Sequence, residues 1–295
     1  MIRIGAPSCG TARPAPSPRL RREARQTYAW VVVVGIVGVI VWSAVGTGTD
    51  LRVFWSGGAW LQIGRFMAGM FPPDLSLDFI RGILWSAVET IAVSLMGTLL
   101  AVLIALPLGV ASSHATHAGA QGAAYDQRSC IRRLARAIPY WGCTLLLNLL
   151  RAIPELFWAL IFILAVGLGP FAGVLALGCH TGGVLGKLFS EVIEEVEPQP
   201  IEALQAIGAA AGAVLAYGVF PLALPQLISY TLYRWEVNIR AAAIIGVVGA
   251  GGIGRDIYVA ISLFHYQQLS TLLLVTLVAV TVVDYLSAWV RSLLR

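Results

Sequence analysis

The sequence predicts an all-α membrane protein, a polytopic bundle of about six transmembrane helices. Composition is the first indication, since 58% of the 295 residues are hydrophobic, 12% are charged and the mean hydropathy is +0.81. The apolar residues also gather into runs long enough to cross the roughly 30 Å hydrocarbon core of a bilayer. Finally, the 20 basic residues, all arginine except Lys187, gather between alternate runs, which predicts an orientation in the membrane.

The amino-terminal region divides into an arginine- and proline-rich tail, residues 1–27, and a first transmembrane helix, residues 28–46. A cleaved signal peptide is the alternative, because Ala44-Val45-Gly46 offers small residues for cleavage. The uncharged run exceeds the ~7 to 15 residues of a signal-peptide core, so we expect a retained span.

The second span is predicted at 83–110, where Glu89 is the only charged residue. An arginine-containing loop is expected at 111–137. The next apolar region, 153–186, has 34 residues with Glu155 as its only charge, which is too long for one helix across the bilayer. Gly167-Leu168-Gly169-Pro170 predicts a break there, which divides the region into two short spans.

The fifth and sixth spans are predicted at 220–248 and 269–290. The segment 191–198 is too acidic to enter lipid, so we expect it in water. Residues 203–218 are alanine-rich and ambiguous. We interpret them as a cytoplasmic amphipathic helix, because alanine and glycine are weakly hydrophobic and a seventh span would scatter the basic residues over both sides of the membrane.

With six spans, fourteen basic residues fall on one side of the membrane and four on the other. The four are Arg52, Arg65, Arg81 and Arg255. Because basic residues favour the cytoplasmic side, this distribution predicts a multi-pass protein of the cytoplasmic membrane with both termini in the cytoplasm.

The loop before the fifth span contains a motif with a family resemblance. Glu202-Ala203-Leu204-x-x-x-Gly208, followed by Gly218-x-Phe220-Pro221, resembles the E-A-A-x-x-x-G-x9-I-x-L-P loop of ABC importer permeases. The chain departs from that pattern at Leu204, Gly218 and Phe220. The stretches 150–156 and 189–254 look more narrowly like the transmembrane subunit of phosphonate importers, and the resemblance covers roughly residues 80–290.

The resemblance implies a type I ABC importer permease fold for residues 80–295, with a cytoplasmic coupling loop at 190–220. It also implies that Glu202, Ala203, Leu204 and Gly208 belong to a coupling helix that docks into a cytoplasmic ABC ATPase dimer, which binds ATP and Mg. Other implied partners are a second permease copy, an extracytoplasmic phosphonate-binding protein and membrane lipid, without nucleic acid. From the residues themselves, small side chains beside one acid suit close docking, and a helix resting on lipid headgroups is the alternative.

The chain has no phosphate-binding loop of its own. The only lysine lies in Gly186-Lys187-Leu188, and Thr181 occupies the position of the first glycine of G-x-x-x-x-G-K-[ST]. The four cysteines form no C-x-x-C pair, and His114 and His117 lie without a third ligand nearby. We therefore expect no catalytic residue, no metal site and no cofactor bound by this chain.

The fifth span contains four polar residues, Arg234, Glu236, Asn238 and Arg240. A charge in the middle of a span costs at least ~2.5 kcal/mol, so these side chains need an interior environment. Glu236 and Arg240 are spaced i,i+4 and can pair, while Arg234 and Asn238 share another face. Either the pair locks helix packing, or an arginine lines the pathway of an anion. We expect Arg234 to do the latter, because Arg240 has a partner.

Three other charged residues, Glu89, Arg151 and Glu155, are interpreted as structural polar contacts that face the bundle.

The stretch after the fifth span contains Gly249-x-Gly251-x-x-Gly254, the spacing of a dinucleotide-binding loop. Such a loop needs a preceding strand and an acid about 20 residues further on, whereas here a membrane helix precedes it and Leu274 occupies the acid position. We expect Gly249, Gly251, Gly252 and Gly254 to allow packing and bending at the outer end of the passage.

These observations predict the permease subunit of an ABC importer for phosphonate, or for a related phosphorus oxyanion such as phosphite or phosphate. A secondary transporter is one alternative, but the chain shows no convincing inverted repeat. An intramembrane enzyme is another, but the chain lacks motifs such as H-E-x-x-H.

Overall fold

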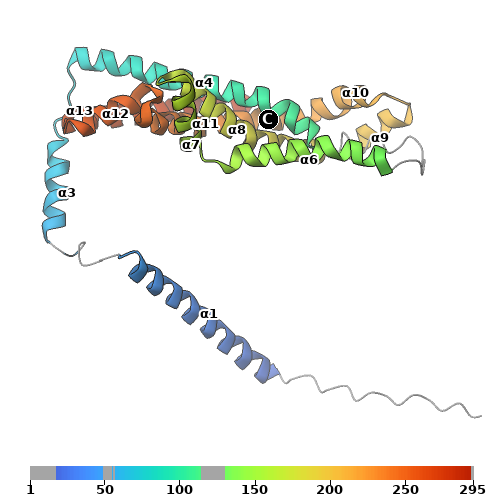
Figure 1. The fold of residues 1–295 in the computed structure, drawn as a ribbon, viewed down its shortest axis with the longest axis horizontal. Helices are drawn as coiled ribbons and strands as arrows, with labels where there is room; N and C mark the ends of the chain where they lie inside the picture. The colour runs from blue at the N-terminus through green and yellow to red at the C-terminus, as the bar shows by residue number, and fades with distance from the viewer. Residues whose placement is uncertain (1–17, 49–54, 56, 114–129, 294–295) are drawn as a thin grey trace, which may run out of the picture. The chain divides into compact units, whose positions relative to one another are not determined.

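The computed structural model describes residues 18–48, 55, 57–113 and 130–293. All regular secondary structure in these ranges is helical (Figure 1). The chain forms two compact units, Met1–Arg65 and Phe66–Arg295. Residues 1–17 of the predicted tail, His114, His117 and Arg128 lie outside the described residues.

Helix α1 spans Pro18–Gly46 and includes the predicted first transmembrane helix. Its stretch Tyr28–Gly46 has a mean hydropathy of 2.4, and its side chains are exposed almost throughout. A helix that is apolar on all faces and exposed is the form expected for a span surrounded by lipid.

The centre of the second unit is the pair α4 (Leu77–Ala111) and α8 (Pro170–Glu194), which pack along each other (Figure 1). Small residues allow the close approach. A Cβ on Gly97 would lie 2.7 Å from Leu177 Cβ, and one on Gly178 would lie 2.7 Å from Leu100 Cγ. Glycine is therefore required at this contact by space, as in other membrane helix pairs.

Helices α6 (Cys130–Ala152) and α7 (Glu155–Val166) form a pair bent by 92°. The bend lies at Ile153 and Pro154. Proline has no N–H and disfavours a helical conformation in the residue before it, so the helix ends there. The loop predicted over 111–137 is therefore wrong in its second part, which is helical from Cys130.

The third span consequently begins earlier than predicted, because Pro139–Ala152 and α7 together are long and apolar enough to form one broken span. The predicted break at Gly167-Leu168-Gly169-Pro170 is confirmed. Helix α7 ends at Val166 and α8 begins at Pro170. Gly167 and Gly169 have φ angles of 93° and 141°, which favour glycine.

Five helices are long and apolar enough to cross a membrane, and the bent pair raises this to six in the described part of the chain. The prediction of about six spans is thus confirmed.

The region predicted as one amphipathic helix over 203–218 is instead divided at Gly208. Helix α9 spans Pro198–Ala206, and α10 (Ala211–Ala213) begins a second helix that continues through a π-helical segment, η1 (Val214–Val219). This helix passes without interruption into α11 (Phe220–Ile245).

The fifth span is therefore part of a longer helix than predicted, Ala211–Ala250. Pro221 lies inside this helix, where its ring crowds the preceding turn and no N–H is available. The wider π-helical turn η1 directly before it accommodates this local defect.

Beyond α11 the chain forms a second π-helical segment, η2 (Gly246–Ala250), then α12 (Gly252–Ser262) and α13 (Tyr266–Leu293). Helix α13 packs against α11, α12 and α4. The ring of Tyr266 contacts that of Phe66, with 5.2 Å between centroids, in the last turn of α3 (Gly57–Gly69). These contacts fix the end of the bundle opposite to α9.

Candidate functional site

The predicted coupling residues lie on and just after α9. Glu202 and Ala203 are exposed, and Leu204 is half-buried. Ile207, which follows the helix, is 80% exposed, and Tyr217 on η1 is 77% exposed. Exposed apolar side chains of this kind are suited to contact with a protein partner. Ile207 and Tyr217 were not among the predicted coupling residues.

Gly208 ends α9 through a Schellman motif. Its N–H donates to Gln205 O at 3.0 Å, and the Ala209 N–H donates to Leu204 O at 3.1 Å. Gly208 has a φ of 78°, while the space around its Cβ position is open. Its conformation, not its size, therefore requires glycine.

Two departures from the family pattern compensate each other. A Cβ on Gly218 would lie 2.9 Å from Leu204 Cδ1. The larger side chain at 204 thus occupies the space that the glycine at 218 leaves free. This contact holds α9 against η1 and fixes the direction of the exposed face that carries Glu202.

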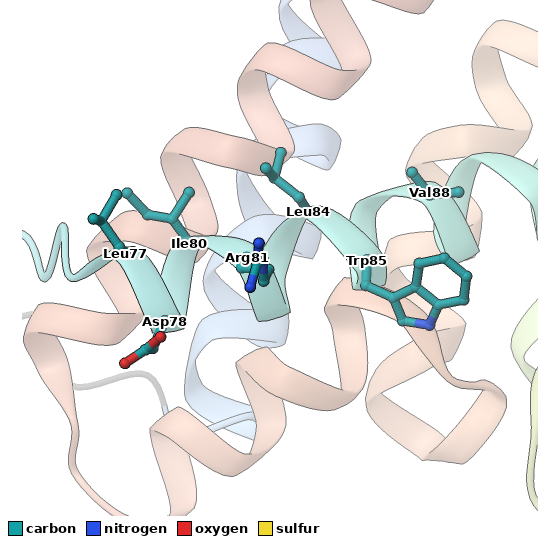
Figure 2. A pocket seen from close by; sticks show the side chains of 7 residues that line it. All are labelled: Leu77, Asp78, Ile80, Arg81, Leu84, Trp85 and Val88. Carbon is teal, nitrogen blue, oxygen red and sulfur yellow. The ribbon is translucent and has the colours of Figure 1, made fainter.

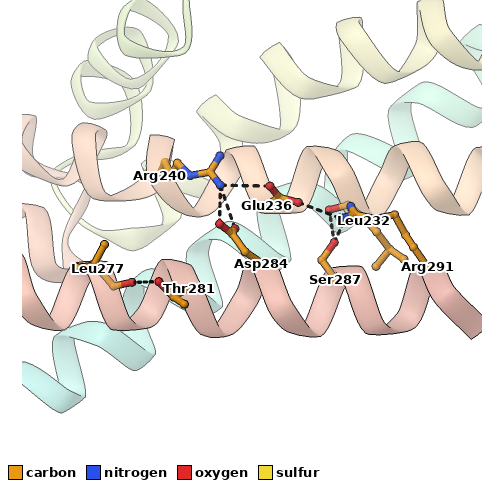
Figure 3. Close-up of polar contacts among 8 residues, drawn as sticks. All are labelled: Leu232, Glu236, Arg240, Leu277, Thr281, Asp284, Ser287 and Arg291. Atoms are coloured by element: carbon orange, nitrogen blue, oxygen red, sulfur yellow. Dashed lines mark hydrogen bonds and ion pairs between the residues drawn. The ribbon is translucent and has the colours of Figure 1, made fainter.

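Helix α11 holds the four polar residues predicted for the passage, and the structure divides them among three environments. Glu236 and Arg240 form the predicted i,i+4 pair, with 3.2 Å between Oε1 and Nη2. Arg240 Nη2 also donates to both carboxylate oxygens of Asp284 on α13, at 2.8 and 3.0 Å (Figure 3). Arg291 Nη2 donates to Glu236 Oε2 at 3.2 Å.

These four residues, Glu236, Arg240, Asp284 and Arg291, are here termed the α11–α13 charge cluster. Ser287 extends it, because it accepts from Arg291 Nη1 at 2.9 Å and donates to Leu232 O at 3.2 Å (Figure 3). The cluster contains two cations and two anions, so it is neutral and internally paired. Sequence reasoning missed Asp284 and Arg291 because no local spacing connects them to α11.

Asn238 is 2% exposed and connects three helices. Thr181 Oγ1 on α8 donates to its Oδ1 at 2.8 Å, and its Nδ2 donates to Thr98 Oγ1 on α4 at 2.9 Å. Thr98 in turn donates to Ser94 O at 2.7 Å. The amide is therefore satisfied inside the protomer.

Arg234, one turn earlier, is in a different situation. Its Nε is buried without a hydrogen-bond partner, and its guanidinium forms no ion pair within the described residues. The acid whose charge acts on it is Glu155, in the first turn of α7. Arg234 is thus a half-buried cation with donor capacity that the described residues leave free.

Glu155 itself lies at the bend between α6 and α7 and pairs with a histidine. Glu155 Oε2 is 3.5 Å from His180 Nε2. His180 Nδ1 is 2.9 Å from Ile153 O, and since a carbonyl only accepts, Nδ1 donates. Close by in sequence, Arg151 Nε donates to Asn148 Oδ1 at 3.1 Å. The residues Glu155, His180 and Arg234 are here termed the bend site.

The glycines predicted for the outer end of the passage form the turn between α11 and α12. Gly249, Gly251 and Gly252 have φ angles of 110°, 81° and 66°. Gly249 O accepts from the Gly169 N–H at 3.0 Å, which joins this turn to the turn between α7 and α8. A Cβ on Gly251 would lie 2.7 Å from Glu89 Oε1.

Thr90 completes the turn, because its Oγ1 accepts from the Ile253 N–H at 2.9 Å. Glu89 lies close to the N-terminus of α12, where the helix dipole favours a negative charge. Gly254 packs against Gly246 and the carbonyl of Ala243, so a side chain there would collide with backbone. A helical segment, η2, directly precedes this turn, unlike the strand that a dinucleotide site needs.

A separate open groove of about 690 Å³ lies along one face of α4, at the end where the helix begins (Figure 2). Seven residues line it: Leu77, Asp78, Ile80, Arg81, Leu84, Trp85 and Val88. None of them belongs to the predicted passage, and Trp85 is 74% exposed.

The family follows from comparison with known proteins. Residues 131–295 match the family described as binding-protein-dependent transport system inner membrane component. A phosphite transport system permease protein of Stutzerimonas stutzeri is 39% identical over 78% of this chain and 77% of its own length. The chain belongs to this family of inner membrane permeases.

Two further similarities are informative. A phosphate-import permease protein of Mycolicibacterium smegmatis strain ATCC 700084 / mc(2)155 is 30% identical over 88% of this chain and 46% of its own length. A chain of the MetNI methionine ABC transporter, in an inward-facing conformation, matches with a TM-score of 0.61 and 20% identity, over 75% of this chain and all of that one. The latter similarity supports the fold, a type I importer permease bundle.

Proposed function

We propose that this chain is the permease subunit of an ABC importer that moves phosphonate, or a related phosphorus oxyanion such as phosphite or phosphate, across the cytoplasmic membrane. The observation that carries the proposal is family membership together with relatives named for phosphite transport and phosphate import. The exposed helix α9, directly before the long helix Ala211–Ala250, supports it.

In this proposal, a cytoplasmic ABC ATPase dimer binds ATP and Mg and contacts Glu202, Ala203 and the α9 surface. Leu204 and Gly208 set the direction and the end of that helix. Ile207 and Tyr217 extend the contact surface, because both are highly exposed, one directly after α9 and the other on η1. ATPase closure would then move α9 and, through η1, the long helix that contains Arg234.

The proposed assembly also contains a second permease copy and an extracytoplasmic binding protein that delivers the oxyanion. We place both termini in the cytoplasm. The helical assignment of Cys130–Ala152 moves Arg151 to the opposite end of α6 from Arg132 and Arg133. This assignment moves one basic residue, Arg151, to the outer half of the membrane. Basic residues still remain in excess on the cytoplasmic side.

Within the passage, we propose that Arg234 is the residue of α11 that contacts the oxyanion. Its partner-free guanidinium supports this, because guanidinium matches phosphorus oxyanions well. Glu236, Arg240 and Asn238 would act indirectly, by holding α11 against α13, α4 and α8. The turn containing Gly249 and Gly251 would allow bending at the outer end.

The proposed coupling is tested with the charge reversal Glu202→Lys in the complete transporter, reconstituted in vesicles. We expect loss of ATPase attachment and of ATP-driven uptake of radiolabelled phosphite. Glu195→Lys, an exposed acid at the end of α8, is the matched control and should leave both intact. Normal attachment and uptake with Glu202→Lys would contradict the proposed coupling.

The secondary-transporter alternative predicts that the permease alone accumulates phosphite down a proton gradient. We expect no accumulation without the ATPase and ATP. Competition among phosphite, methylphosphonate and phosphate in the complete system identifies the preferred oxyanion, which the binding protein sets to a large extent.

A further inference from the structure

The bend between α6 and α7 places an acid beside an imidazole, and α7 packs against α11, the helix that contains the arginine proposed for the passage. Glu155 begins α7, His180 lies near the middle of α8, and Arg234 lies near the middle of the helix Ala211–Ala250. The Glu155 side chain is 36% exposed, whereas that of His180 is 17% exposed. The carboxylate therefore has room to move, and the two nitrogen-bearing groups are more enclosed.

The hydrogen-bond geometry shows an excess of donors at this place. His180 Nδ1 donates to Ile153 O, and its Nε2 faces Glu155 Oε2 at 3.5 Å. Both ring nitrogens thus face oxygen atoms of the protein. Arg234 has no ion-pair partner among the described residues and is attracted by the same acid. The same carboxylate thus lies beside His180 and is the acid whose charge acts on Arg234.

We propose that Glu155 is a resident anion of the passage: it lies beside His180 and balances the charge of Arg234 while the passage is empty, and the transported oxyanion displaces it. This inference rests on the proposed function and adds Glu155 and His180 to the residues that determine passage. A phosphorus oxyanion carries several acceptor oxygens, so it can satisfy the free donors of Arg234 and replace the carboxylate at His180.

The arrangement has a physical advantage for transport. A desolvated cation inside a membrane bundle is costly without a counter-charge, and Glu155 supplies that charge between transport events. The same carboxylate repels a bound oxyanion, which shortens its residence. A passage must bind its ion strongly enough to admit it and weakly enough to release it, and an internal competitor achieves this balance.

The inference is tested by equilibrium binding of radiolabelled phosphite and phosphate to the permease–ATPase complex in nanodiscs, without the binding protein. We expect Glu155→Gln to tighten binding about tenfold, which corresponds to about 1.4 kcal/mol. Arg234→Gln should weaken binding by a similar factor. In the double variant, the gain from Glu155→Gln should disappear, because the competitor acts through the arginine.

The matched control is Glu236→Gln, which removes one negative charge from the same membrane region but from an acid that contacts Arg240 and Arg291. It should leave the binding constant unchanged. An equal gain in affinity with Glu236→Gln would mean that net charge alone is responsible, and the inference would be wrong. The inference would also be wrong if Glu155→Gln left binding unchanged or made it weaker. It would equally be wrong if neither the Glu155→Gln variant nor the parent bound phosphite or phosphate.

A purely structural Glu155–His180 pair gives a different pattern, namely lower thermal stability with unchanged affinity. If Glu155→Gln does not assemble, His180→Gln provides the second test, since loss of the imidazole should weaken oxyanion binding. Uptake by the complete unmodified transporter distinguishes failure of the proposed function from failure of the inference. Absence of phosphite, phosphonate and phosphate uptake refutes the proposed function, whereas normal uptake with unaltered affinity in Glu155→Gln refutes the inference alone.

Discussion

Two groups of charges on the same helix differ in how completely they are paired. In the α11–α13 charge cluster, Arg240 has both Glu236 and Asp284 as partners within 3.2 Å. In the bend site, Arg234 lies six residues earlier and has no ion pair among the described residues. The comparison teaches that residue type does not separate a structural arginine from a candidate ligand-binding one. The two kinds of arginine are separated by the number of carboxylates that neighbouring helices supply.

The first and largest expected effect is at the unpaired arginine. Arg234→Ala should lower uptake about tenfold or more, because charged hydrogen bonds of about 1.5–3 kcal/mol to the oxyanion are lost. Assembly with the ATPase and thermal stability should remain close to those of the parent. Uptake in vesicles and co-purification of the ATPase measure the two effects, and unchanged uptake would remove Arg234 from the passage.

The second effect is expected at the paired arginine, Arg240, where stability should change and uptake should not. Asp284→Asn should destabilise the protein by about 1–2 kcal/mol, because Arg240 loses a bidentate partner that is only partly shielded from solvent. Uptake per folded molecule should change little. Thermal unfolding in detergent, compared with uptake normalised to folded protein, tests this. A specific transport defect without destabilisation would instead place this cluster in the passage.

A third variant sharpens the comparison at Asn238, which lies between Arg234 and Arg240 on the same helix. Asn238→Ala removes two side-chain hydrogen bonds between α11 and its neighbours, each worth about 0.6 kcal/mol in membrane proteins, so we expect a loss of about 1 kcal/mol. Affinity for phosphite should be retained, because the amide is enclosed in the protomer. A selective loss of phosphite affinity would place this face in the passage.

The smallest effect is expected outside both charge groups, at the contact that directs α9. Gly218→Ala should cost under about 1 kcal/mol, because the added methyl meets the movable end of Leu204. Leu204→Ala in the same chain should relieve the collision. Thermal unfolding of the two single variants and the double variant measures this coupling. Strict additivity would show that the two positions do not compensate each other.

The sequence supports predictions wherever the cause is local. Uncharged runs and the Gly-Leu-Gly-Pro break predict most spans, because length, proline and glycine act on the segment in which they occur. The pair Glu236–Arg240 follows from helical spacing alone.

Predictions failed where a helix was judged by composition. The arginine-rich start of α6 was interpreted as a loop, although arginine is a good helix former and the apolar half that follows completes the span. The region 203–218 was predicted as one helix for a similar reason, although the structure divides it at Gly208. Weakly apolar alanine and glycine do not indicate where one helix ends and the next begins.

By itself, therefore, the sequence determined that this is a helical membrane protein and where most of its spans lie, since hydropathy and helix breaks are local properties. Only the tertiary structure decided which charges are satisfied. Asp284 lies 44 residues from Arg240, and His180 meets Glu155 from another helix. Packing distant segments side by side brings these groups together, and no spacing along the chain encodes that proximity.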